Sequence, residues 1–573
     1  MSYIAITLIA YLPFQADTPK APMLWWPEAA NGVCANGVHT SYQRGRGLLD
    51  SSSLRMKWET PIPSDLFTTG YGLNTYGPLV YDVDLDGTPE VIVAYGRIIP
   101  GPTPSLGYLL VLDGRTGAYE WIWTHPNFAV DDMTPAIGYL DNDPNPEIVL
   151  FSQNMEVDDM ETLRVFCLDG VTRDLEWQRC LLPSSLGPQG HCVVIADANS
   201  DGKQDILISI KSDYIPSSFR VVCLRGDDGT IIWQRDTCYS EIPLCWDING
   251  DGIPEVVVRK YNTYGYVALS GLDGSTVWRF SGGNYTFRCP TLADADADGE
   301  WEIVTAGSTG YASGVFWING KTGALEREYV PSKYCNIAMD AITGQMDQDP
   351  AQETIAWIMQ FYGLTCSDGA TALEQWRYQL SPPDTLGRCQ GAMADIDNDG
   401  ENEVVVTSYC RVLGQILYRL SCVGPTGELE WKIDFPGTNC FPAIYPIMAD
   451  VDADGWLEVI LAPRWVYWGP ESDTPKIRVI DNEGALPIEE AIRPLRPPTM
   501  LALPGRIILI LPDPCPVDLS IYDLAGRKVK ELYKGQLPAG THEFELTGLE
   551  PGVYVARLSY DGVITTKALV VRR

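Results

Sequence analysis

The feature that most constrains this chain is a nine-residue acidic motif that recurs eight times. Its first copy, DVDLDGTPE, has aspartates at positions 1, 3 and 5, glycine at position 6 and an acid at position 9. Six copies are intact, and they end at Glu90, Asp205, Glu255, Glu302, Glu403 and Glu458. Two further copies, YLDNDPNPE and QMDQDPAQE, lack the first acid and carry proline in place of the glycine. The terminal acids lie 47 to 58 residues apart, a period typical of four-stranded propeller blades.

A second motif alternates with the first and places a tight turn before a strand that carries tryptophan. Its copies are LDGRTGAYEW, LDGVTRDLEW, GDDGTIIW, LDGSTVW, SDGATALEQW and GPTGELEW. Asp-Gly and Thr-Gly steps supply the positive backbone angles that hairpin turns need. Each unit is therefore predicted to contain strand A, the acidic loop, strand B, a variable loop, strand C, the turn and strand D.

The two ends of the repeat array are incomplete in complementary ways. Residues 54–60 resemble a strand D without a strand C, whereas residues 476–484 resemble a strand C followed by a poor strand D. The N-terminal strand is predicted to complete the last blade, which would remove the free sheet edges that invite aggregation. The predicted fold is all-β: an eight-bladed β-propeller at residues 76–490, followed by a small antiparallel β-sandwich. Seven blades or an open array are the alternatives.

The acidic loop has the composition of a calcium site. Side chains at positions 1, 3 and 5 converge, glycine allows a sharp reversal, and the terminal acid returns to the cluster; hard oxygen ligands in a flexible ring suit calcium. An EF-hand places its last glutamate further from the glycine and lies between helices, whereas here a strand follows at once. Turn propensity alone is a weaker explanation, because several carboxylates within nine residues repel one another without a cation. General acid and base residues need differing environments, which near-identical repeats do not offer.

Calcium is therefore the predicted cofactor, and the predicted ligands include position 7 for its carbonyl oxygen. They are Asp82, Asp84, Asp86, Thr88, Glu90, Asp197, Asn199, Asp201, Lys203, Asp205, Asp247, Asn249, Asp251, Ile253, Glu255, Asp294, Asp296, Asp298, Glu300, Glu302, Asp395, Asp397, Asp399, Glu401, Glu403, Asp450, Asp452, Asp454, Trp456 and Glu458. The two proline-containing loops are expected to bind weakly or not at all.

These loops and their strands resemble the FG-GAP or VCBS repeats of integrin-alpha-type β-propellers over about residues 76 to 484. The resemblance implies calcium between the first two strands of a blade, as a structural brace. Tyr139 and Gln345 depart from the pattern at position 1. The turn and tryptophan motifs also resemble the tryptophan-docking motifs of eight-bladed quinoproteins, which would imply a dehydrogenase with a quinone cofactor. Packing between blades explains the tryptophans better, because they recur in nearly every unit whereas a cofactor site occurs once.

The last seventy residues differ in period from the repeats. A proline-rich linker, residues 491–504, precedes alternating apolar and polar residues from 505 to 573, a pattern typical of antiparallel strands. The segments LSIYDLAGRKV, LPAGTHEFEL, GVYVARL and TTKALVVRR resemble the type A C-terminal sorting domain of the type IX secretion system. An ordinary accessory sandwich is the alternative. Residues 1–19 are interpreted as a secretory leader without the usual basic residues, and residues 20–75 as an N-terminal segment that includes the ring-closing strand.

Composition excludes several classes of function. The formal charge of −34 argues against a nucleic-acid partner, and no stretch approaches the roughly 20 apolar residues of a membrane helix. The four histidines have no metal-ligand spacing, and no phosphate loop or serine nucleophile elbow occurs. Fifteen cysteines favour an oxidising compartment, and disulfides between blades are expected, for instance Cys180 with Cys192 and Cys238 with Cys245. The tripeptide Arg225-Gly226-Asp227 is interpreted as part of a turn.

The leading functional hypothesis is a secreted or cell-surface binding and adhesion module for a glycan or protein, exported by the type IX machinery. An extracellular polysaccharide lyase on an eight-bladed propeller is the alternative, and a quinoprotein-like dehydrogenase is less favoured. Ligand contacts are expected on the face opposite the acidic loops, where aromatic rings can stack on sugars or anchor proteins. The candidate aromatic residues there are Tyr214, Tyr261, Tyr264, Tyr362, Trp465, Tyr467 and Trp468.

Overall fold

The computed structural model describes most of the chain between Tyr42 and Val571, and every regular element in the described part is a strand. The segments outside the description are 1–41, 47–53, 64–72, 75–76, 98–105, 127, 129–133, 156–160, 185–187, 213–219, 237, 239–242, 260–264, 283–285, 288–289, 309–312, 333–340, 359–362, 380–390, 413–414, 438–439, 442–445, 464, 467–475, 483–498, 504–505, 512–514, 523–526, 538–539, 550–551, 561–562 and 572–573. Within the described residues, no helix has the length and apolarity to cross a membrane.

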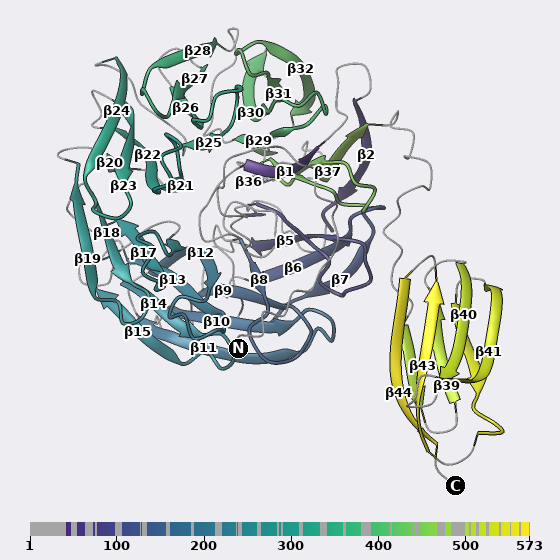
Figure 1. Cartoon of the computed structure of the whole chain (residues 1–573). Helices are drawn as coiled ribbons and strands as arrows, with labels where there is room; N and C mark the ends of the chain where they lie inside the picture. The colour runs from purple at the N-terminus through teal and green to yellow at the C-terminus, as the bar shows by residue number, and fades with distance from the viewer. Residues whose placement is uncertain are drawn as a thin grey trace. The chain divides into compact units, whose positions relative to one another are not determined.

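Residues 17–484 form one compact unit, a β-propeller whose antiparallel sheets are arranged in a ring (Figure 1). Among the described residues, eight sheets share one plan, in which four strands follow one another from the centre of the ring outward. We name each sheet after its second strand.

The innermost strands are β4 (Leu79–Tyr81), β8 (Ala136–Gly138), β12 (Pro188–Ala196), β16 (Leu244–Trp246), β21 (Thr291–Ala293), β25 (Ile342–Gly344), β29 (Gly391–Asp395) and β34 (Ile447–Ala449). The second strands are β5 (Glu90–Arg97), β9 (Glu147–Met155), β13 (Asp205–Ser212), β17 (Glu255–Arg259), β22 (Glu302–Ser308), β26 (Glu353–Ile358), β30 (Glu403–Val412) and β35 (Glu458–Leu461). The third strands are β6 (Leu106–Asp113), β10 (Glu161–Asp169), β14 (Arg220–Arg225), β18 (Gly265–Ser270), β23 (Ser313–Asn319), β27 (Gly363–Asp368), β31 (Gln415–Val423) and β37 (Lys476–Asn482). The outer strands are β7 (Tyr119–Trp123), β11 (Leu175–Ser184), β15 (Ile231–Asp236), β19 (Thr276–Ser281), β24 (Leu325–Ser332), β28 (Glu374–Gln379), β32 (Leu429–Gly437) and β2 (Leu54–Pro61).

The second and third strands of each sheet are apolar along most of their length, because neighbouring sheets cover both of their faces. Ile92, Val93, Leu110 and Val111 of the β5 sheet are all fully buried. Outer strands alternate instead: β15 runs exposed, intermediate, buried and exposed from Ile231, and Trp233 is its buried residue. Most units of the sequence repeat therefore contain two apolar strands and one strand with a buried tryptophan, because each sheet packs against its neighbours.

The ring is joined by strands from opposite ends of the unit. β2 pairs antiparallel with β37, with Leu54 opposite Asn482 and Pro61 opposite Lys476. Short strands add a second junction, in the order β33 (Cys440–Phe441), β36 (Trp465–Val466), β3 (Leu73–Asn74) and β5. The N-terminal segment thus contributes β2 and β3 to two different sheets of the propeller.

Two further short strands of the described part lie outside the common plan. β1 (Tyr42–Arg46) pairs parallel with the innermost strand β29, so this N-terminal segment lies toward the centre of the ring (Figure 1). β20 (Thr286–Phe287) pairs with β22 beside β21. Neither strand has a counterpart in the repeat motifs.

The second unit contains two antiparallel sheets. One has the order β38 (Thr499–Leu503), β39 (Arg506–Leu511) and β42 (Gly540–Glu545); the other has the order β41 (Lys528–Leu537), β40 (Cys515–Tyr522), β43 (Gly552–Tyr560) and β44 (Val563–Val571). Ile507 and Leu509 of the first sheet share one buried cluster with Leu519 and Leu558 of the second. The unit therefore has a hydrophobic core of its own.

Candidate metal centres

Each acidic motif lies between the innermost and second strands of its sheet. The position 9 acid is the first residue of the second strand in all eight sheets, and none is more than 2% exposed. Lys203 of one acidic loop pairs with Asp227 of the following turn at 3.1 Å, and Asn145 donates to Asp169 at 2.7 Å. Acidic loops and the turns between third and outer strands therefore lie on one face.

Backbone amides hold the acids of the first loop in place. Gly87 N donates to Asp82 Oδ2 at 2.9 Å, Thr88 N to Asp86 Oδ1 at 2.7 Å, and Val83 N to Glu90 Oε2 at 2.7 Å. Position 4 has φ 62° and position 6 has φ 90°, so a left-handed turn brings these amides inward. Leucine at position 4 is strained in this region, by about 1 to 2 kcal/mol, whereas the glycine at position 6 is not.

The six intact loops share this backbone, and the two proline loops do not. Positive φ recurs at position 4 in Ser200, Gly250, Ala297, Asn398 and Ala453. The position 6 amide donates to the position 1 aspartate again in the loops that begin at Asp197, Asp247, Asp294 and Asp450. Pro144 and Pro350 have no amide hydrogen to donate, and the acceptor is also missing there, because Tyr139 and Gln345 occupy position 1. The two departures from the motif therefore remove the two partners of one hydrogen bond.

The first loop is a candidate cation site by its burial and charge. Asp82, Asp84, Asp86 and Glu90 each offer an oxygen, and these oxygens lie within 4.8 Å of one another. Burial, followed by the neighbouring carboxylates, raises the pKa of Glu90 to about 9 and that of Asp82 to about 6. Glu90 is fully buried, yet its Oε1 accepts no hydrogen bond from the described residues. A buried carboxylate oxygen with no donor costs free energy that a bound cation would offset.

Other loops repeat this feature with differences that matter for binding. Buried oxygens without a donor in the described part also occur on Asp205, Glu403 and the proline-loop acid Glu147. Glu302 and Glu458 have such an oxygen too, but their carboxylates lie 3.7 Å from Arg327 and Lys57. In contrast, Asn249 Nδ2 donates to Glu255 Oε1 at 2.5 Å. These oxygens make several of the predicted loops candidate cation sites, and calcium there, with the position 7 carbonyls as ligands, stays a prediction.

A fifth acidic group, missed by the sequence reasoning, comes from the outer strand. Glu176 lies with Asp141 and Glu147 in one cluster, and Glu326 with Asp296 and Glu302 in another, with oxygens within 4.8 Å. Each glutamate immediately precedes the outer-strand position at which most sheets carry tryptophan. Glu120 and Glu430 hold the same place in the β5 and β30 sheets, where burial, followed by the carboxylates of the loop, raises the pKa of each. The recurring Glu-Trp pair in YEW and LEW was the available signal.

The tryptophans connect neighbouring sheets. The indole Nε1 of Trp58, Trp177, Trp233 and Trp278 donates to the carbonyl of a turn glycine in the next sheet, at 2.6 to 3.0 Å. A Cβ added to the turn residue Gly274 would lie 2.7 Å from the Trp233 ring. These contacts favour the packing interpretation of the tryptophans over a cofactor site.

Several further predictions have different outcomes. Six of the seven aromatic ligand candidates, Tyr214, Tyr261, Tyr264, Tyr362, Tyr467 and Trp468, lie outside the described residues, and Trp465 is described only as part of strand β36. The two disulfides given as examples, Cys180 with Cys192 and Cys238 with Cys245, are wrong, because Cys180 and Cys245 are thiols. Cys245 is buried in its strand, a position in which the side chain packs as a small apolar group. Arg225 and Asp227 pair with each other at 2.7 Å, as part of a turn.

Of three comparisons with known proteins, that with solved structures alone found similar chains. No family model matches the chain, and no curated protein matches it. Among solved structures, the quinohemoprotein alcohol dehydrogenase of Comamonas testosteroni is similar at 12% identity and a TM-score of 0.48, over 78% of this chain and 80% of that one. The quinohemoprotein alcohol dehydrogenase ADHIIG of Pseudomonas putida HK5 is similar at 11% identity and a TM-score of 0.49, over 82% of each chain. The Dos1 propeller is similar at 8% identity and a TM-score of 0.43, over 75% of this chain and 95% of that one. Likenesses of this degree carry no inference about activity.

Proposed function

We propose that this chain is an extracellular, calcium-braced, eight-bladed β-propeller of the FG-GAP or VCBS type that serves as a binding module. The observation that carries the calcium assignment is the buried Glu90 Oε1, which lies among three other acids and has no donor among the described residues. A divalent cation satisfies such an oxygen and neutralises the cluster at the same time.

In the first loop, Asp82, Asp84, Asp86 and Glu90 would hold the ion, with the Thr88 carbonyl as a further ligand. These residues span the connection from β4 to β5, so the ion would fix the first hairpin of the sheet. The same acids recur in loop after loop, which suits a structural role better than acid and base catalysis at one site.

The binding role is assigned to the face opposite the acidic loops. The sequence predicts that the aromatic candidates, including Trp465 and Trp468, belong to that face, and aromatic faces stack on sugar rings or anchor protein contacts. We assign the second unit to a β-sandwich that directs export through the type IX machinery, because its sequence carries that resemblance and its core is separate.

The calcium assignment is tested by elemental analysis and calorimetric titration of the whole chain. Glu90→Gln and Asp82→Asn should each lower the number of bound calcium ions by one. Glu545→Gln is the matched control, because it makes the same chemical change at an exposed residue of the other unit. Calcium-free protein after dialysis against millimolar calcium would refute the assignment.

The binding role is tested on a glycan array and in a polysaccharide lyase assay with the same preparation. Trp465→Ala and Trp468→Ala should weaken binding to any glycan detected while leaving the melting temperature nearly unchanged. Cleavage of a pectic polymer would instead support the lyase.

A further inference from the structure

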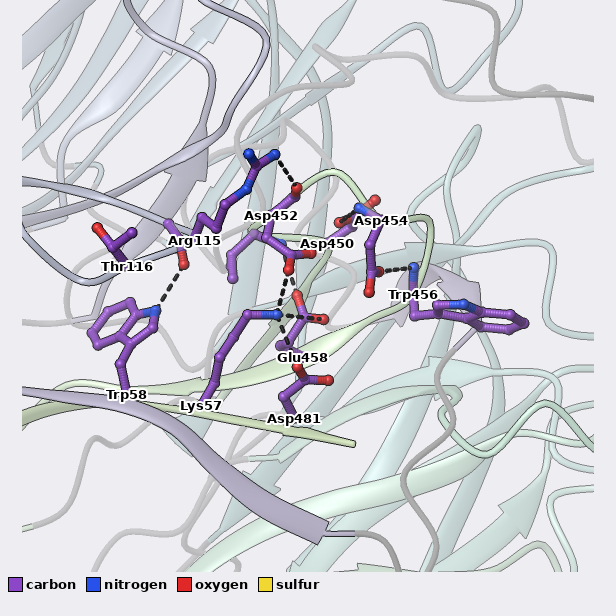
Figure 2. A network of polar contacts seen from close by, with 12 residues as sticks. Lys57, Trp58, Arg115, Thr116, Asp450, Asp452, Asp454, Trp456, Glu458 and Asp481 are labelled. Carbon is purple, nitrogen blue, oxygen red and sulfur yellow. Dashed lines mark hydrogen bonds and ion pairs between the residues drawn. The ribbon is translucent and has the colours of Figure 1, made fainter. Parts of the chain in front are cut away.

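A lysine from the ring-closing strand enters the last acidic loop. Lys57 Nζ lies 2.6 Å from Asp452 Oδ2, 2.9 Å from Asp481 Oδ2 and 3.7 Å from Glu458 Oε1 (Figure 2). Asp452 is position 3 of the loop and Glu458 is position 9. Burial lowers the pKa of Lys57, but Glu458, Asp452 and Asp481 raise it by more, so the side chain is a cation.

The β22 sheet shows the same arrangement with an arginine. Arg327 replaces the docking tryptophan on the outer strand, opposite Trp317. Its Nη1 bonds to Asp296, at position 3, and its Nη2 lies 3.7 Å from Glu302, at position 9. In both sheets a basic group from the outer strand therefore contacts the same two loop acids.

Lys57 is the residue before the tryptophan of its outer strand. Other sheets carry different side chains at this position. Gln375 Nε2 donates to Asp347 at 2.9 Å and to Glu353 at 3.4 Å, again positions 3 and 9 of its loop. Four sheets carry glutamate at this place, and the β13 and β17 sheets carry Ile232 and Val277. The loop motifs alone do not reveal these differences, because the last loop is intact and yet has a lysine beside it.

We infer that Lys57 and Arg327 take the place of calcium in the β35 and β22 sheets. An ammonium or guanidinium group that pairs with the position 3 acid and lies 3.7 Å from the position 9 carboxylate offsets the negative charge that an ion would otherwise neutralise. The inference rests on the proposed calcium function, which it deepens by assigning which intact loops hold an ion. Closure of the ring through β2 then needs no calcium, while other sheets depend on it.

Native mass spectrometry and calorimetric titration of the full chain with calcium alone test the inference. Lys57→Met keeps most of the side-chain length without the charge, and Arg327→Met does the same in the other sheet; each should bind one more calcium ion than the wild type. The reciprocal change Glu120→Lys should remove one ion from the β5 sheet, and circular dichroism checks that each variant folds.

The outcomes separate this inference from the proposed function. Unchanged stoichiometry in both methionine variants, with calcium bound to the wild type, would overturn the inference alone. A wild type that binds no calcium would overturn the proposed function, whereas a gain of one ion in either variant supports the basic group as the replacement in that sheet.

Discussion

Replacing Gly274 by alanine should destabilise the propeller through two separate effects. Gly274 has φ 69°, and an L-residue in that region is strained by about 1 to 2 kcal/mol. The new Cβ would also lie 2.7 Å from Cε3 of the Trp233 ring, and overpacking of this kind costs about 1 to 3 kcal/mol. Alanine lowers the entropy of the unfolded chain, which offsets about 0.4 to 1 kcal/mol. We expect a net loss of about 2 to 4 kcal/mol.

Denaturant unfolding followed by tryptophan fluorescence measures this loss. Ala372 supplies the matched control, since it holds the same turn position with φ 56°, and the preceding sheet has Arg327 in place of a tryptophan. Ala372→Gly should change stability by less than about 1 kcal/mol. In a Trp233→Leu background, Gly274→Ala should cost only the backbone contribution. Equal costs in both backgrounds would show that the indole does not press on this turn.

Three further predictions concern calcium, pH and the second unit. Chelation should lower the melting temperature, because at roughly 1 mM calcium each site with a dissociation constant of about 10⁻⁴ to 10⁻³ M adds about 0.4 to 1.4 kcal/mol to the free energy of unfolding. Scanning calorimetry with and without chelator measures this change, and identical curves would contradict the prediction. In chelator, the pKa of Glu90 and Glu403 in the folded state is about 9 and that of Glu302 about 8, above the ordinary 4.5. The folded state therefore binds more protons than the unfolded state, and stability should fall as pH rises from about 5 to 9. A melting temperature higher at pH 9 than at pH 6 would refute this. Deletion of residues 499–573, which lie in a separate unit, should leave the propeller's circular dichroism and melting transition intact, and loss of that transition would show that the units depend on one another.

The spacing of acids and turns predicted the strand order well, because each motif combines a backbone requirement with a chemical one. Glycine at position 6 marks a left-handed turn, and the acid at position 9 starts the next strand. Both requirements are local, so nine residues suffice to express them. The pairing of β2 with β37 could also be predicted, since a lone outer strand and a lone third strand complement each other.

Contacts between distant segments were harder to predict. Lys57 and Asp481 are separated by 424 positions, and nothing in the loop DVDADGWLE indicates a lysine beside it. The disulfide prediction failed for a related reason: sequence proximity of Cys238 and Cys245 does not fix the geometry that a bridge requires. The glutamates before the tryptophans were visible in the motifs. That their side chains point toward the acidic loop is decided by the pairing register of the strands alone.

The pairing of β2 with β37 has a consequence for synthesis of the chain. β2 is made early, but its partner strand begins at Lys476, so on a ribosome it waits unpaired while the seven sheets between them are translated. Its tryptophan docks on Gly114, yet its hydrogen-bonded edge stays open. Pairing across so long a separation carries a high entropic cost and slows folding. A nascent chain stalled anywhere before Lys476 would therefore expose this edge to other chains, and full-length release is the step that protects it.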